Sequence, residues 1–193
     1  MRIVILFVSF CVLAVMSCGN SNNAAPAGEV AKRVLLPVHS KLNDKDTRQL
    51  MTVVTAYYGL KNALVASKAT RADSAAYLLT IAADTLRLSL VNDSTEMTSL
   101  KPYFDTIIGY SKSLKEINDP SCERQRLLFG SISGSMYSLL KNVELSNARV
   151  YHEYCPMAFN EKGATWLSEE AEIKNPYFGK KMLECGEVTD SLK

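Results

Sequence analysis

The feature that most constrains this chain is the stretch from Asp44 to about Val143, where apolar residues recur at helical spacing and Gly and Pro are nearly absent from the periodic segments. Four such segments follow one another, and each set of apolar positions covers one face of an amphipathic helix. Because the connections at 67–70 and 118–119 are short, neighbouring helices should run antiparallel. The pattern predicts a mainly α fold, an antiparallel up-down four-helix bundle.

The apolar stripes define the expected core. They comprise Leu50, Val53, Val54, Tyr57, Leu60 and Leu64; then Leu78, Leu79, Ala82, Ala83 and Leu86; then Phe104, Ile107, Ile108, Leu114 and Ile117; and finally Phe129, Ile132, Met136, Leu139, Leu140 and Val143. Thr70 is expected to cap the second helix, and the third should start between Thr95 and Lys101. Asp119-Pro120 is typical of a helix start and should open the fourth.

The N-terminus indicates export. Arg2 is followed by an apolar run, residues 3–16, that is too short to span a bilayer as a helix. Ser17 precedes Cys18, and the polar sequence GNSNNAAPAG follows. Residues 1–17 therefore resemble a bacterial lipoprotein signal, with Cys18 carrying the lipid, although Val15 and Met16 differ from the usual lipobox and leave ordinary signal cleavage as an alternative.

This signal divides the chain and predicts its location. Residues 18–43 form a flexible tether and residues 44–193 a helical domain, whose C-terminal part, about 148–188, carries the CPM and MLxCG sequences. We expect a lipoprotein of the cell envelope, periplasm-facing or at the surface, anchored to a membrane through Cys18.

Composition argues against several function classes. The formal net charge is +2 and no run of Lys or Arg follows a helix face, so a nucleic-acid partner is not expected. Of the two histidines, His39 and His152, the second lies three residues before Cys155, and residues at that spacing on a strand point to opposite faces. No phosphate-binding Gly loop or nucleophile elbow is present. We do not expect an enzyme.

The chain changes character after Asn147. RVYHEYC is compatible with a short strand, and the Pro and Gly residues that follow are typical of an ordered, loop-rich segment. Trp166 and Phe178 supply large apolar anchors, so this segment should pack on the bundle.

The candidate functional residues of this segment are its sulfur-containing side chains. Cys155 and Met157 lie two residues apart, and Met182 and Cys185 lie three apart. Two thiolates and two thioethers would suit Cu(I), whereas zinc would prefer His152 to the thioethers. A Cys155–Cys185 disulfide that staples the segment is an open alternative, and the methionines could be core residues. Cys122 is expected to be a small buried thiol.

The segment also carries four sequence blocks: CPMA, GATWLS, IKNPYFG and MLECGEV. Together with YYGLKNALVASKA and RQRLLFGSISGSMYSLLK, they resemble the domain of unknown function 3347 family over about residues 48–188. That family occurs alone in small exported proteins or fused to periplasmic adaptor subunits of copper/silver efflux systems, whose small heavy-metal-binding domain also has CPM followed by CG. The resemblance implies a role near copper or a related soft metal, with Cys155, Met157, Met182 and Cys185 as candidate ligands.

Two functions remain open on the sequence. The first is an envelope lipoprotein that binds a soft ion, Cu(I), in support of metal efflux or tolerance. The second is a structural or interaction module with a Cys155–Cys185 disulfide, which docks an efflux adaptor or another envelope partner.

Overall fold

The computed structural model describes residues 37–91 and 94–192; the expected signal peptide, Cys18 and tether residues 18–36 lie outside these ranges. Within the described part, the folded unit begins before the expected boundary at 44. His39 pairs with Ser146 through two main-chain hydrogen bonds of 2.8 and 3.1 Å, and Leu42 is buried. The end of the expected tether therefore packs on the segment that follows the fourth helix.

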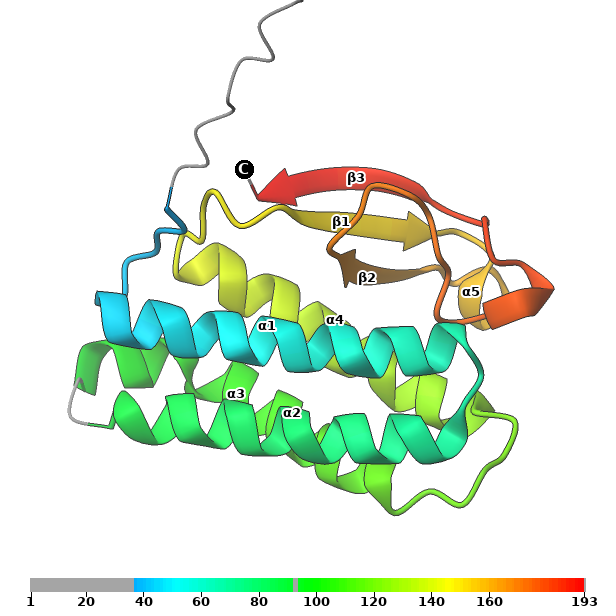
Figure 1. Ribbon diagram of the computed structural model, residues 1–193, viewed down its shortest axis with the longest axis horizontal. Helices are drawn as coiled ribbons and strands as arrows, with labels where there is room; N and C mark the ends of the chain where they lie inside the picture. Colours follow the sequence, from blue (N-terminus) through cyan, green and yellow to red (C-terminus); the bar gives the residue numbers. More distant parts are fainter. Residues whose placement is uncertain (1–36, 92–93, 193) are drawn as a thin grey trace, which may run out of the picture. The chain divides into compact units, whose positions relative to one another are not determined.

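Four long helices in succession make up most of the domain: α1 (Asp44–Val65), α2 (Ala69–Ser89), α3 (Ser94–Lys115) and α4 (Glu123–Asn142). Each packs against the next, in an up-down arrangement (Figure 1). The apolar stripes of α1 and α4 are completely buried, as their spacing predicted. The mainly α bundle expected from the sequence is confirmed. None of the helices in the described ranges is both long and apolar enough to cross a membrane.

The helix starts differ from those expected. Lys68, not Thr70, is the N-cap residue of α2, and it makes no side-chain capping bond. α4 begins at Glu123, because Asp119-Pro120 forms a turn ahead of the helix: the Asp119 carboxylate accepts hydrogen bonds from the Ser121 and Arg124 main-chain N–H groups at 3.0 and 2.9 Å. Asp119 thus caps α4 from outside the helix.

The stripe of α2 is also narrower than expected. Leu79, Ala83 and Leu86 are buried, but the Leu78 side chain is 59% exposed. Helical periodicity places Leu78 next to the buried face without fixing how far the neighbouring helices reach around it.

The C-terminal segment is more regular than a loop-rich tail. It forms β1 (Val150–Cys155), a short turn α5 (Ala158–Glu161), β2 (Ala164–Ser168), the 3₁₀ turn η1 (Gly179–Lys181) and β3 (Glu187–Leu192). The strands make an antiparallel sheet in the order β2-β1-β3. Of the three strands, only β1 was expected. The sequence of β3 lacks an alternating apolar pattern, and its first three residues are exposed. The sheet packs through β2 on α4 and α1 (Figure 1).

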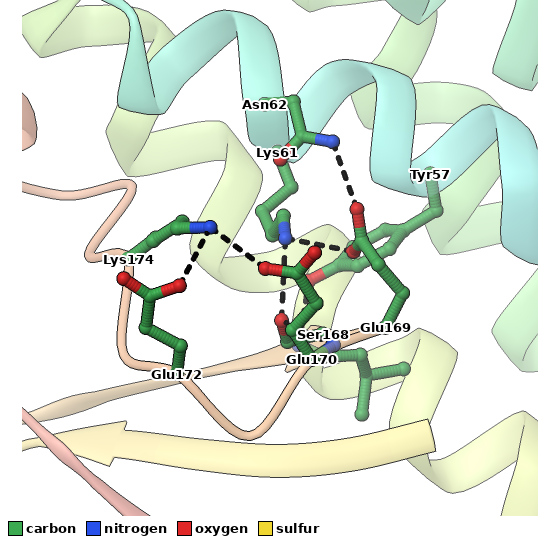
Figure 2. Close-up of polar contacts among 9 residues, drawn as sticks. Tyr57, Lys61, Asn62, Ser168, Glu169, Glu170, Glu172 and Lys174 are labelled. Atoms are coloured by element: carbon green, nitrogen blue, oxygen red, sulfur yellow. Dashed lines mark hydrogen bonds and ion pairs between the residues drawn. The ribbon is translucent and has the colours of Figure 1, made fainter. Parts of the chain in front are cut away.

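Polar contacts fix the end of β2 to α1 (Figure 2). The Lys61 ammonium, 2% exposed, lies 2.8 Å from the Glu169 carboxylate and 3.3 Å from the Ser168 hydroxyl. The Leu167 main-chain N–H donates to the Tyr57 hydroxyl at 3.0 Å, and the Asn62 amide donates to Glu169 at 3.0 Å. The Lys61 ammonium is buried while the Glu169 carboxylate is 38% exposed, so the pair anchors the end of β2 to α1 at the rim of the core.

Candidate functional site: a pair of thiols at the end of the sheet

The structure brings two cysteines together from positions 30 residues apart. The sulfurs of Cys155 and Cys185 are separated by 2.8 Å, the proximity that both functions required. Cys155 is the last residue of β1 and is fully buried, whereas Cys185 follows η1 and is partly exposed. Cys185 is therefore the thiol that a molecule in solution meets first.

The two thiols are within hydrogen-bonding distance of each other, and either sulfur could be the donor. A hydrogen bond to Cys155, together with burial, raises the pKa of the Cys185 thiol well above its ordinary value. Cys185 therefore holds its proton at neutral pH, and either a metal ion or an oxidant must displace it.

The sheet positions Cys155. In the register of β1 and β2, Cys155 lies opposite Ala164 and Glu153 lies opposite Trp166. Gly186, directly after Cys185, has φ of 148°, and a Cβ there would lie 2.8 Å from a ring atom of Trp166. Only glycine lets the chain pass this closely over the indole, which explains the Cys-Gly pair in the last sequence block.

The loop that carries Cys185 is held from the bundle. The Arg126 side chain in α4 donates to the Pro176 carbonyl at 2.8 Å, to the Ser121 carbonyl at 2.8 Å and to the Leu64 carbonyl at 3.1 Å. Arg126 is 7% exposed, so its guanidinium joins the end of α1, the start of α4 and the NPYFG sequence inside the protein. From that anchor, the Asn175 side chain donates to the Cys185 carbonyl at 2.7 Å.

The two methionines that are near the cysteines in sequence both have accessible side chains. Met157 is 48% exposed, and Met182 is half-buried at the end of η1. Within residues 37–91 and 94–192, no hydrogen bond joins either paired thiol to a methionine sulfur. Met157 is thus a surface residue, not a core residue.

His152 belongs to a different cluster. Its ring stacks on Tyr137 with centroids 3.9 Å apart, and Nδ1 lies 2.8 Å from the Thr189 hydroxyl. Burial lowers the pKa of His152, so the imidazole is neutral at pH 7. In the described part of the chain, no group of three or more His, Cys, Asp or Glu side chains is arranged to hold a metal ion. The structure therefore does not bring His152 to the thiol pair.

The third cysteine of the domain is a buried thiol, as expected. Cys122 precedes α4 with φ of 63°, and it is fully buried. Burial raises the pKa of the Cys122 thiol, which makes it unreactive at neutral pH.

A buried acid lies two residues before Cys155. Glu153 is completely buried, and neither carboxylate oxygen has a hydrogen-bond partner in the described residues. Burial raises the pKa of Glu153 to about 7, although the Lys61 ammonium and the Trp166 indole act in the opposite direction. Ionisation of Glu153 therefore opposes folding near neutral pH.

A groove of about 390 Å³ lies between α4 and the segment around α5 and β2. Its lining residues are Leu127, Gly130, Ser131, Tyr154, Phe159, Gly163, Ala164 and Thr165. None of these is a thiol, imidazole or carboxylate, so the groove offers no soft donors and the thiol pair remains the candidate site.

The comparisons with known proteins concern the helical part. Residues 53–148 match the family model described as protein of unknown function (DUF3347). The chain carries a DUF3347 domain. The match ends before β1, so the thiol pair lies outside the matched residues. Searches of curated proteins and of solved structures found no match to the chain.

Sequence reasoning missed three residues that hold the sheet and the Cys185 loop on the bundle: Lys61, Arg126 and Asn175. A signal for two of them was present. Lys61 lies four residues after Tyr57, and Arg126 three before Phe129, so both lie on helix faces that carry an apolar stripe. Asn175 lies in the IKNPYFG block, but its sequence neighbours do not show which atoms its amide contacts.

Proposed function

We propose that this protein is an envelope lipoprotein that binds a soft metal ion, Cu(I), through Cys155 and Cys185, in support of metal efflux or tolerance. The observation that carries the proposal is the 2.8 Å approach of one buried and one partly exposed thiol. Thiolates and thioethers are the protein ligands that select Cu(I) over hard ions. In this proposal the protein is no enzyme, because the sulfurs are ligands and the bundle is their support.

The two thiolates would be the principal ligands. On a tetrahedral ion with metal–sulfur bonds of about 2.3 Å, two thiolates are separated by roughly 3.7 Å. The 2.8 Å separation is shorter, so uptake of an ion requires loss of the thiol protons and a small separation of the sulfurs. The exposed Met157 thioether is free to complete the ligand set, and Met182 is the second candidate.

The proposal also includes a membrane anchor and a partner protein. Lipid on Cys18 would hold the domain at a membrane, and a periplasmic efflux adaptor would be the recipient of the ion. The anchor rests on the signal sequence and the partner on the family resemblance; the anchor is tested separately, with Cys18→Ala.

A second function is favoured by the same distance. Because 2.8 Å is shorter than the separation of two metal-bound thiolates, the pair is also close to the geometry of a disulfide. In this alternative a Cys155–Cys185 disulfide staples the C-terminal segment, and the exposed surface of that segment docks an envelope partner.

The test is Cu(I) binding by reduced, anaerobic protein against a competing chelator. We expect one ion per chain, with binding abolished in Cys155→Ser and Cys185→Ser because each loses a charged ligand. Met157→Leu and Met182→Leu should weaken binding less, since a thioether is a neutral donor.

Cys122→Ser is the matched control, because it removes a buried thiol that is not paired. Equal uptake by wild type and by the Cys155→Ser/Cys185→Ser protein would contradict the metal proposal. Reduced wild-type protein that takes up no copper would leave the structural alternative.

A further inference from the structure

Asn175 connects two loops with a single buried amide. It is completely buried, and its side-chain oxygen accepts hydrogen bonds from the main-chain N–H groups of Tyr177 and Phe178 at 2.7 and 3.2 Å. Its side-chain nitrogen donates to the Cys185 carbonyl at 2.7 Å, and its main-chain N–H donates to the Leu183 carbonyl at 2.8 Å. One residue thus closes the NPYFG turn and holds the loop of Cys185.

The NPYFG turn is itself fixed to the bundle. The Arg126 guanidinium donates to the Pro176 carbonyl at 2.8 Å. Gly179, with φ of 55°, lies so close to α1 that an added Cβ would be 2.7 Å from the Ser67 hydroxyl oxygen and 3.0 Å from the Val65 carbonyl. α1 and α4 therefore fix the position of Asn175, and Asn175 in turn fixes the loop of Cys185.

The two sulfurs consequently have separate supports. Cys155 is held by β1, whose partners are β2 and β3, whereas the Cys185 carbonyl is held by the Asn175 amide. The 2.8 Å separation of the sulfurs depends on both supports being in place. Loss of the Asn175 donor should release one sulfur while the other stays in the sheet.

We propose that Asn175 is a positioning residue that sets the spacing of the two thiols and thereby their equilibrium with the disulfide. In the reaction that measures this, the two thiols react with one glutathione disulfide. One sulfur–sulfur bond forms in the protein and one breaks in glutathione disulfide. Two electrons and two protons pass from the protein thiols to glutathione disulfide, which becomes two molecules of glutathione. The proposal concerns spacing alone and holds whether or not a metal ion binds.

The test is the equilibrium constant for that exchange, measured on the full chain with a metal chelator present. Asn175→Asp keeps the shape of the side chain but replaces the donor with an oxygen that faces the Cys185 carbonyl. We expect the constant to fall at least tenfold, which corresponds to a reduction potential about 30 mV more oxidising. Asn175→Ala, which removes the donor without adding charge, should change it in the same direction but less.

Two controls separate positioning from general destabilisation. Asn142→Asp makes the same chemical change in α4, where the amide donates to the Tyr103 hydroxyl at 3.2 Å, away from both loops. Ile107→Val shortens a core side chain in α3, which packs between α2 and α4. Both variants should keep the wild-type constant within about twofold.

Two results would overturn the proposal. One is an unchanged constant in Asn175→Ala, the variant that also decides the matter if Asn175→Asp fails to fold. The other is an equal fall in Ile107→Val, which would show that the constant follows overall stability and not the spacing of the thiols.

Discussion

Oxidation of the paired thiols is a perturbation whose size follows from the structure. Cys155 and Cys185 are 30 residues apart in sequence, and their sulfurs already lie 2.8 Å apart, so a disulfide can close with little movement of the backbone. For a closed loop of this length, the chain-entropy model gives a stabilisation of about 3.7 kcal/mol. For a domain of this size, 1 kcal/mol corresponds to about 2–4 °C, so the melting temperature should rise by about 7–15 °C.

The assay is thermal unfolding of metal-free protein, followed by circular dichroism with and without a thiol reductant. A Cys122→Ser background removes the third thiol of the domain, so that one disulfide alone can form within it. In that background we expect the oxidised form to melt above the reduced form. A Cys155→Ser/Cys185→Ser protein should melt at the same temperature under both conditions.

An oxidised protein that melts no higher than the reduced one would refute the reasoning. That result would mean that the thiols are close but badly oriented for a bond, so that strain in the folded state cancels the entropic gain. A rise in the double-serine control would instead indicate an effect of the reductant unrelated to this pair.

Three further predictions concern the support and the anchor. Arg126→Lys should lower the free energy of unfolding by about 3–5 kcal/mol in urea denaturation, because it leaves buried carbonyls such as that of Pro176 without a donor; a loss below about 1 kcal/mol would contradict this. Glu153→Gln, in metal-free protein, should be more stable than wild type by about 3 kcal/mol at pH 8 and equal to it near pH 4, as measured by urea denaturation. The folded-state pKa of Glu153 is raised to about 7 from 4.5, so the stability that its protonated form contributes is complete below about 4.5 and is lost as the pH rises through 7; parallel pH profiles would show that Glu153 is hydrated. Cys18→Ala should move the protein from the membrane fraction to the soluble fraction, because a lipid on that thiol is the expected anchor, and unchanged fractionation would remove the lipoprotein proposal.

The helix bundle could be predicted because the spacing of apolar residues within each segment is enough to indicate an amphipathic helix. The stripes through Tyr57 in α1 and Phe129 in α4 repeat every three or four residues, and any chain with that period buries one helix face. Helix ends were less certain, because they depend on single turns. Asp119-Pro120 has the composition of a helix start, but its carboxylate bonds to N–H groups further along and moves the start to Glu123. Strand β3 could not be predicted, because its residues do not alternate between apolar and polar and its first half is exposed.

For the site, the sequence by itself determined the residue types: two cysteines that each have a methionine nearby, in a segment with the Gly and Pro residues of ordered loops. It could not determine which of them meet. The tertiary structure decided that Cys155 and Cys185 touch, that Met157 points to solvent and that His152 lies with Tyr137. It also decided that Asn175 and Arg126 hold the loop of Cys185, contacts that join residues 10 and 50 positions apart. The physical reason is that periodicity reports which side of an element faces the core, whereas a thiol pair depends on how two separately anchored segments pack on the same bundle.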